Sequence, residues 1–367
     1  MTGPGDSGLK VGIAAREITP PPGFHLSGFI ARTSASLGVC DPLQLSVLAA
    51  SDEHTTALIM VFDLIGLTPR WIAATRKRVT DATGVPALNQ MYACTHTHGD
   101  PETGVLLSSS GVNADYMHSL VGQAKSAAQE ALNNRIPAEL RLGAGTSYAG
   151  ANRRSAEINP NGPHDGGIDD IDPTIIVAQL RRFDGRPLVT VVNYGCHPTS
   201  TTDCVYTADY PGFLRASIAA TTGAPCIYIN GAGGDVNLRF NNPHQRGLAA
   251  ERRYGVQLAC EGLRALDTGH RSATATVMAS RTVASLVYAD RISPQEARRV
   301  RADGQRTLAT ARTLAERRRA QETMINYANI VLATYRDRQR SLHLPVAPPS
   351  RDTNNSNRRS CHRRNSG

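Results

Sequence analysis

The first two-thirds of the chain alternates short apolar runs with stretches that repeat apolar residues at helical spacing. The apolar runs are bounded by Gly, Pro and Asp, and they predict strands at residues 11–18, 43–50, 57–64, 87–94, 140–144, 174–180, 188–194 and 226–229. Helical patterns cover residues 71–83, 115–133, 212–222 and 246–266. This order predicts an α/β fold, a layered domain with a mixed β-sheet core flanked by helices.

The character of the sequence changes near residue 293, after a further predicted strand at residues 277–288. Ser293 and Pro294 are typical of a helix start, and the Ala/Arg/Glu-rich stretch to about residue 340 predicts one or two surface helices. Residues 342–346 resemble the start of another strand. The remaining residues are basic and rich in Asn and Ser, so they cannot bury enough apolar surface to fold. We predict a domain over residues 1–345, with a helical segment at 293–340, and a disordered basic tail over 346–367.

Composition narrows the function classes. The net charge of +9 comes mainly from Arg late in the chain, and aromatic residues make up only 5%, so we predict a solvated helix face and no nucleic-acid partner. No apolar run reaches the ~18 residues of a transmembrane segment. The first residues lack the pattern of a signal peptide, which predicts a cytoplasmic protein. Seven cysteines without a CxxC pair favour reduced thiols over a disulfide framework or a thiolate zinc knuckle.

The sharpest local signal is the motif THTHGD at residues 95–100, directly after a predicted strand. In an extended strand, residues two apart project from the same face, so His96 and His98 are predicted to point at one spot. Open α/β sheets bind ligands at strand ends, and imidazole is the usual nitrogen ligand of zinc. The alternative is a polar loop with two hydrogen-bonded histidines.

A second motif, NYGCHPTS at residues 193–200, also follows an apolar strand. Gly195 permits a tight turn there, so His197 is expected at the same edge of the sheet as His96. Taken alone, His197 is better interpreted as a core histidine bonded to a carbonyl. Two histidine sites at strand ends of one α/β domain favour a metal.

Three further segments carry candidate polar groups. The motif NGAGGDVN at residues 230–237 lacks the spacing of a phosphate-binding loop. Its glycines, Asp235 and Asn237 are expected near a substrate carbonyl or a ligand histidine. The alternative is a plain turn. Arg153 lies in a Gly-rich loop, where it could stabilise an oxyanion or simply be a surface residue. Asp209 could support a ligand histidine, but capping a helix is the safer interpretation.

In order, these motifs are similar to those of the neutral/alkaline, non-lysosomal ceramidase family, in its N-terminal catalytic domain. They are THTHGD at 95–100, NRR at 152–154, NYGCHPT at 193–199, TADYPG at 207–212 and NGAGGDVN at 230–237. The resemblance runs from about residue 10 to about residue 346. It is carried by five modestly specific motifs in the family's order, and the chain resembles a short bacterial-type member.

The resemblance implies a site and a reaction. Members of the family hydrolyse the amide bond of ceramide at a zinc ion. By this likeness His96 and His197 ligate Zn²⁺, His98 lies beside the metal as an active-site residue, and Arg153 contacts the substrate or the developing oxyanion. A water on zinc, with its pKa lowered towards ~7, then attacks the polarised carbonyl. The implied partner is a small-molecule or lipid-like amide, and the oligomeric state stays open.

The sequence departs from the family pattern in two places. The family has a serine where this chain has Asn237, which excludes acylation at that position and makes a related amide or ester as plausible a substrate as ceramide. The family also completes its zinc shell with a glutamate and a tyrosine that have no match here, and we interpret the abrupt change of sequence at residue 346 as a truncation or a shifted reading frame. His98 or Asp209 is a hypothetical replacement ligand.

Two alternatives stay open at the level of sequence. One is a catalytically impaired remnant of the family, or a binding protein, that lacks a complete metal shell. The other is an amidohydrolase-type barrel, which also contains an HxH motif. Its HxH normally lies on the first barrel strand, so the late position of His96 and the scarcity of Lys speak against it.

Overall fold

The computed structural model of the chain describes most of the predicted domain. The described residues are 8–29, 34–105, 112–158, 166–239, 246–272, 276–286, 292–313 and 342–346, together with Arg32, Glu316, Ala320, Met324, Ile325, Ala328, Asn329 and Leu332. The predicted tail lies outside this part of the chain, except for Val346. Most of the second half of the predicted helical segment, beyond residue 313, also lies outside it.

Two five-stranded sheets form the centre of the fold. The first has the order β5-β4-β3-β1-β6 and consists of β1 (Lys10–Glu17), β3 (Gln44–Ser51), β4 (Thr56–Phe62), β5 (Gln90–Cys94) and β6 (Ile136–Pro137). The second has the order β12-β10-β9-β7-β14 and consists of β7 (Glu139–Thr146), β9 (Thr174–Arg181), β10 (Pro187–Tyr194), β12 (Cys226–Asn230) and β14 (His270–Arg271). Each sheet is mixed, because β4–β5 and β10–β12 are parallel while the other pairs are antiparallel.

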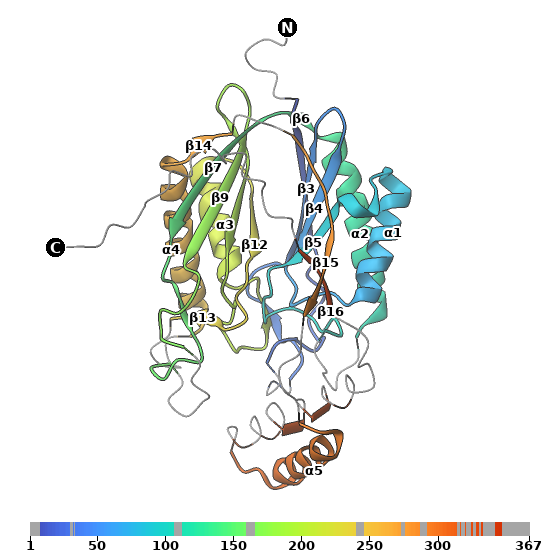
Figure 1. The fold of residues 1–367 in the computed structure, drawn as a ribbon, viewed down its shortest axis with the longest axis vertical. Helices are drawn as coiled ribbons and strands as arrows, with labels where there is room; N and C mark the ends of the chain where they lie inside the picture. The colour runs from blue at the N-terminus through green and yellow to red at the C-terminus, as the bar shows by residue number, and fades with distance from the viewer. Residues whose placement is uncertain are drawn as a thin grey trace, which may run out of the picture.

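Helices cover the outer face of each sheet (Figure 1). The first sheet packs against α1 (Pro69–Thr83) and α2 (Ala114–Asn133), and the second against α3 (Tyr210–Thr222) and α4 (Leu248–Asp267). A third apolar cluster, which includes Val11, Val61, Val189 and Ile227, joins the inner faces of the two sheets. The molecule is therefore a helix–sheet–sheet–helix sandwich, which confirms the predicted α/β class and places two sheets where the sequence indicated one mixed core.

The sandwich explains the unbroken apolar runs of the sequence. Strand β3, with the sequence QLSVLAAS, is buried along almost its whole length because one face meets α2 and the other meets the second sheet. A strand that is covered on both faces loses the apolar–polar alternation of a half-exposed strand. Continuous apolar runs of this kind are correct indicators of strands here.

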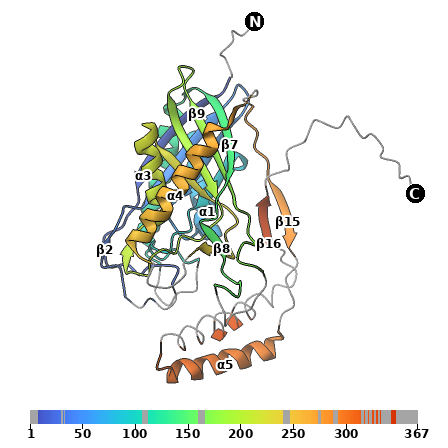
Figure 2. The same ribbon diagram turned by 90° about the vertical axis from the view of Figure 1, so that its left-hand side faces the viewer.

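Smaller elements lie outside the two main sheets. Strand β2 (Gly38–Val39) pairs with β11 (Val205–Tyr206), β8 (Gly150–Asn152) with β13 (Val236–Leu238), and β15 (Thr282–Leu286) with β16 (Leu342–Val346), the strand predicted at residues 342–346. Helix α5 (Pro294–Thr310) lies beyond one end of the sheets in both views (Figures 1 and 2). As predicted, Ser293 caps it, with the Ser293 hydroxyl accepting a hydrogen bond from the N–H of Glu296 at 3.1 Å.

One predicted strand begins later than expected. Residues 87–89 form a 3₁₀ turn, η1 (Ala87–Asn89), so β5 begins only at Gln90.

In the described part of the chain, six cysteines are free thiols and none is in a disulfide. No described helix has the length and apolar character needed to span a bilayer.

Candidate metal centre

His96 follows the end of β5 and is held in an unusual backbone conformation. Its φ is 66°, in the left-handed region, which costs a non-glycine residue about 1–2 kcal/mol. Its N–H donates to the carbonyl of Leu64 at 3.0 Å, and its ring Nδ1 lies 2.7 Å from the carbonyl of Ile65. The buried Asp100 carboxylate accepts a hydrogen bond from the Ile65 N–H at 2.7 Å. Asp100 thereby holds Ile65, the residue whose carbonyl orients the His96 ring.

His197 reaches the same place from the second sheet. After β10 ends at Tyr194, the chain turns and the N–H of His197 donates to the carbonyl of Val236 at 2.9 Å. The ring Nδ1 lies 2.6 Å from the carbonyl of Gly233. Gly233 itself packs against backbone, since an added Cβ would lie 2.7 Å from the N of Cys196. The glycines of the NGAGGDVN motif therefore allow the close backbone approach that orients His197.

The two rings face each other through their Nε2 atoms, which are 3.2 Å apart. A carbonyl can only accept, so Nδ1 of each ring carries the hydrogen and each neutral ring has a lone pair at Nε2. Burial lowers the pKa of both His96 and His197, the latter to about 4, which favours the neutral forms. Two lone pairs at this distance repel unless a cation lies between them.

His98 completes a group of three imidazoles. Its ring centroid lies 5.4 Å from that of His96 and 5.6 Å from that of His197, and one ligand atom from each of the three rings lies within 4.8 Å of the other two. Both ring nitrogens of His98 are buried, and neither has a hydrogen-bond partner among the described residues. Burial and the neighbouring charges hold the pKa of His98 well below its ordinary value. The predicted convergence of His96 and His98 is present, but a left-handed turn at His96 produces it rather than strand alternation.

Asn230 ties the two histidine-bearing loops together. Its side-chain NH₂ donates to the carbonyl of Thr95 at 3.1 Å, and its side-chain oxygen accepts from the N–H of Cys196 at 3.2 Å. These two residues directly precede His96 and His197. One amide at the end of β12 thus sets the spacing between the ends of β5 and β10, a role that the sequence motif alone did not reveal.

Arg153 and Asn237, predicted to act on substrate, both lie near the histidine cluster. The pairing of β8 with β13 positions them, and the N–H of Arg153 donates to the carbonyl of Asp235 at 2.8 Å. The Arg153 charge acts on His96, His98 and His197, where it contributes to lowering each pKa after the larger effect of burial. Asn237 forms a backbone bridge with His197, and its buried side-chain oxygen has no partner among the described residues.

Asp209 has the helix-capping role that the sequence favoured, and Asp235 contacts Arg153 through its backbone. Asp209 accepts hydrogen bonds from Ser200 N and Oγ at 2.7 and 2.5 Å and from Tyr210 N at 2.6 Å, so it caps α3 and fixes the loop after His197. Asp235 contributes its backbone carbonyl to Arg153. The partners of the His96 and His197 rings are the carbonyls of Ile65 and Gly233. The motif at residues 230–237 had a ligand histidine among the expected neighbours of its glycines, whereas no motif pointed to Ile65, because any residue carries a carbonyl.

Comparison with solved structures identifies the fold. The structure is similar to that of a ceramidase complexed with C2, with a TM-score of 0.64 and 18% sequence identity, covering 72% of this chain and 44% of that chain. It is also similar to neutral ceramidase from Pseudomonas aeruginosa, with a TM-score of 0.62 and 18% identity, covering 72% of this chain and 45% of that chain. The chain has a ceramidase-like fold. It spans less than half the length of these two proteins. No protein-family model matches the sequence, and neither does any curated protein.

Within the ceramidase-like fold, the histidine cluster offers ligand atoms that could hold a metal ion. It offers nitrogen donors that are neutral at physiological pH, as metal binding requires. Two nitrogens at ~2.0–2.1 Å from one tetrahedral ion lie about 3.3 Å apart, close to the observed separation of 3.2 Å between the two Nε2 atoms. Three protein ligands with a fourth position left open are typical of catalytic zinc.

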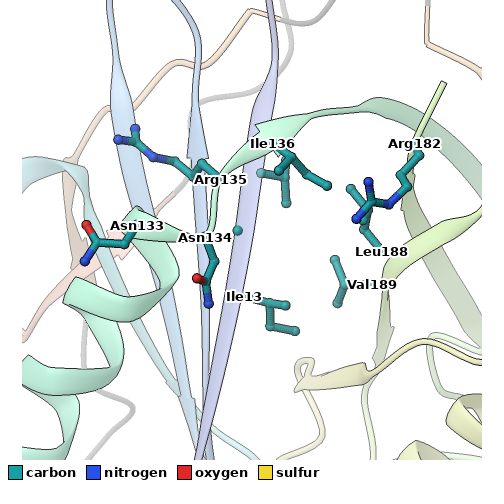
Figure 3. Close-up of a pocket in the computed structure, with 10 residues that line it drawn as sticks. Ile13, Asn133, Asn134, Arg135, Ile136, Arg182, Leu188 and Val189 are labelled. Atoms are coloured by element: carbon teal, nitrogen blue, oxygen red, sulfur yellow. The ribbon is translucent and has the colours of Figure 1, made fainter.

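A cavity also lies away from the histidine cluster (Figure 3). It has a volume of about 410 Å³ and lies between the two sheets, where Ile13, Asn134, Arg135, Arg182 and Val189 line it. Val189 is near the start of β10, whereas His197 follows the end of that strand. The cavity and the histidine cluster are therefore at opposite ends of the second sheet, and the cavity contains no histidine or carboxylate for metal chemistry.

Gly28→Ala is expected to weaken zinc binding by about tenfold or more, because a Cβ at Gly28 would lie 2.4 Å from Cγ of His98 and displace that ring. Gly23→Ala is the matched control. Both glycines have a positive φ, 90° and 107°, but an added Cβ at Gly23 meets no atom within 4 Å. Titration calorimetry gives the zinc affinity of both variants. The difference between them separates the clash with the His98 ring from the backbone strain that both substitutions introduce. Equal affinities in the two variants would place His98 outside the metal site.

Proposed function

We propose that the chain is a zinc-dependent hydrolase that cleaves an amide or ester bond in the manner of a ceramidase. His96, His197 and His98 hold the zinc ion. The observation that carries the proposal is the pair of opposed Nε2 atoms, 3.2 Å apart, each with its Nδ1 committed to a carbonyl. The unpartnered ring nitrogens of His98 support the third ligand.

Each residue of the site has a separate task. When bound, zinc supplies a Lewis acid that polarises the scissile carbonyl and makes water acidic enough to attack near neutral pH. The carbonyls of Ile65 and Gly233 fix the tautomers of His96 and His197, so that both present a lone pair to the metal. Arg153 provides a positive charge where negative charge develops on the carbonyl oxygen, and a buried site strengthens that interaction.

Asn237 is suited to bind the amide group of the substrate. Its buried side-chain oxygen has no hydrogen-bond partner among the described residues, and it lies next to His197 through the backbone bridge. A secondary amide can donate its N–H to this oxygen, whereas an ester has no hydrogen to donate. An amide is therefore the preferred substrate class, and the ceramidase-like fold favours a lipid-like acyl group.

The function is tested by chelation and metal return. Treatment with a chelator is expected to abolish hydrolysis of a chromogenic N-acyl amide, and stoichiometric zinc is expected to restore it. The same assay on the matching ester reports whether the site prefers amides. Hydrolysis that is unchanged in the metal-free protein, or metal-free protein that binds no zinc when zinc is returned, would contradict the proposal.

Asn237→Ala is expected to lower kcat/KM for the amide by about 100-fold while leaving zinc content unchanged. The physical reason is loss of one oriented hydrogen bond to the reacting group, with no ligand removed. Hydrolysis of the matching ester should fall much less, because the ester makes no such hydrogen bond. Parallel steady-state assays on both substrates provide the measurement, and an equal loss on both would show that Asn237 does not contact the amide N–H.

A further inference from the structure

A second cluster of metal-binding side chains lies apart from the histidines. One ligand atom each from Cys40, Asp41 and Glu251 lies within 4.8 Å of the other two. Cys40 and Asp41 directly follow β2, and Glu251 is in the first turn of α4. The N–H of Cys40 donates to the carbonyl of Tyr206 at 2.8 Å, which anchors the cluster to β11. Three separate elements therefore converge on this point.

The hydrogen bonds of the cluster leave Glu251 incompletely satisfied, whereas the second Asp41 oxygen accepts from the N–H of Ala208 at 3.1 Å. The Thr207 hydroxyl lies 2.5 Å from an Asp41 oxygen and 3.0 Å from Glu251 Oε2, and it also accepts from the N–H of Asp209 at 2.9 Å. A hydroxyl has one hydrogen, so it can donate to only one of these carboxylates. Glu251 is 1% exposed, and its buried Oε1 has no partner among the described residues.

The charges around Glu251 are of the same sign. Asp209, Asp41 and Asp203 all act to raise its pKa, which burial and these neighbours together bring to about 8. Burial likewise raises the pKa of Asp41 to about 6. The guanidinium of Arg215 makes two hydrogen bonds to Asp63, at 2.7 and 2.6 Å, and its charge offsets only part of the effect of burial on the pKa of Asp41. A buried group of carboxylates in this situation either keeps protons or binds a cation.

We propose that Cys40, Asp41 and Glu251 form a second metal site, for a zinc-like divalent cation. A thiolate and two carboxylates match the ligand preferences of such an ion, and the fourth position is open to water or to the Thr207 hydroxyl. Cys40 is exposed and gives the ion a route from solvent. On binding, the thiol and any protonated carboxyl release their protons to water, and the metal–ligand bonds replace the O–H and S–H bonds.

The site is connected through Thr207 to the loop that carries His98. The Thr97 hydroxyl donates to the carbonyl of Thr207 at 2.7 Å, and the N–H of Thr207 donates to the carbonyl of Gly99 at 3.0 Å. An ion that holds Asp41 and Glu251 in place around the Thr207 side chain also fixes Thr207. Because Thr207 is hydrogen-bonded to residues 97 and 99, the ion stabilises the turn at residues 97–99. The second ion is a positioning element for the proposed hydrolase site, and it takes no part in the chemical step.

Cobalt titration of the purified metal-free protein tests the proposal. Co²⁺ bound at Cys40 gives a thiolate-to-cobalt charge-transfer band in the near ultraviolet, which an all-imidazole site cannot give. In the wild type and in the control Cys260→Ser, an exposed thiol on α4, we expect a band that corresponds to one thiolate-bound Co²⁺ per chain, in addition to the Co²⁺ bound by the histidine cluster. We expect the band to be absent in Cys40→Ser. In Glu251→Gln we expect the affinity of this site for Co²⁺ to fall at least tenfold.

The failure of this proposal can be distinguished from failure of the proposed function. His197→Ala should keep the charge-transfer band, because the second site contains no histidine, while it loses the imidazole-bound ion. Absence of the band at saturating Co²⁺ in the wild type, or its persistence in Cys40→Ser, would overturn the second site. Cys40→Ser is a small change at an exposed position, and an unaltered circular dichroism spectrum in the metal-free state confirms that the variant folds.

Discussion

His197→Ala is expected to remove the zinc ion of the histidine cluster, with a loss of affinity greater than about 100-fold. Loss of an outer partner of a metal ligand already costs about 10–100-fold, and this change removes a ligand itself. It also leaves His96 with its Nε2 directed at empty space. Metal analysis after gel filtration gives the measurement. The experiment is done in the Cys40→Ser variant, so that zinc bound at the second site does not add to the measured zinc content.

His54→Ala is the control for this experiment, because His54 is exposed in the turn between β3 and β4. Zinc content in that variant should equal that of the parent. Zinc content that is also unchanged in His197→Ala would remove His197 from the metal site and, with it, the basis of the proposed hydrolase.

Arg215→Met is expected to destabilise the fold by about 3–5 kcal/mol, because it leaves Asp63 as a buried charge without its partner. Arg215 is on α3, which covers the second sheet, whereas Asp63 follows β4 of the first sheet. The pair is bidentate at 2.7 and 2.6 Å, and the two side chains are only 11% and 1% exposed. It therefore joins the two halves of the sandwich near the ends of their strands.

Urea unfolding of the metal-free protein measures this effect as a shift of the transition midpoint at constant slope. Arg186→Met is the matched control, since Arg186 pairs with Asp184 at the surface and should contribute less than about 1 kcal/mol. The double variant Asp63→Leu with Arg215→Met should recover part of the lost stability, because no charge is left buried. A loss below about 1 kcal/mol for Arg215→Met alone would show that Asp63 is compensated by other groups.

The layered architecture was predictable because the apolar runs mark strands directly. Predicted strands at residues 188–194 and 226–229 correspond to β10 and β12 almost residue for residue. What the sequence could not supply is the split into two sheets. The face of a strand that meets a helix and the face that meets another sheet are equally apolar, as in β3, so periodicity does not distinguish them.

The candidate site was predictable only in part, for a related reason. Sequence motifs identified His96, His98 and His197 as side chains with metal chemistry, and the structure brings these three together. Its supporting contacts come largely from backbone groups and from a glycine. These contacts depend on where the backbone lies in the folded protein, and the type of a residue does not determine that position. Examples are the carbonyls of Ile65 and Gly233 and the space next to Gly28.

The second cluster was missed for a different reason. Cys40 and Asp41 are adjacent, but Glu251 lies about 210 residues later, and no known ligand spacing connects it to them. They meet because β2 pairs with β11 and α4 begins next to the loop after His197, where the N–H of Gly247 donates to the carbonyl of Ser200 at 2.7 Å. Only the tertiary structure shows such a convergence.

The most direct test of the central claim is a crystal of the protein grown with zinc, measured on both sides of the zinc absorption edge. The account predicts an anomalous peak at ~2.0–2.1 Å from Nε2 of His96 and Nε2 of His197, with a ring nitrogen of His98 as the third ligand. Anomalous density that is absent from the space between these rings, in protein saturated with zinc, would contradict it.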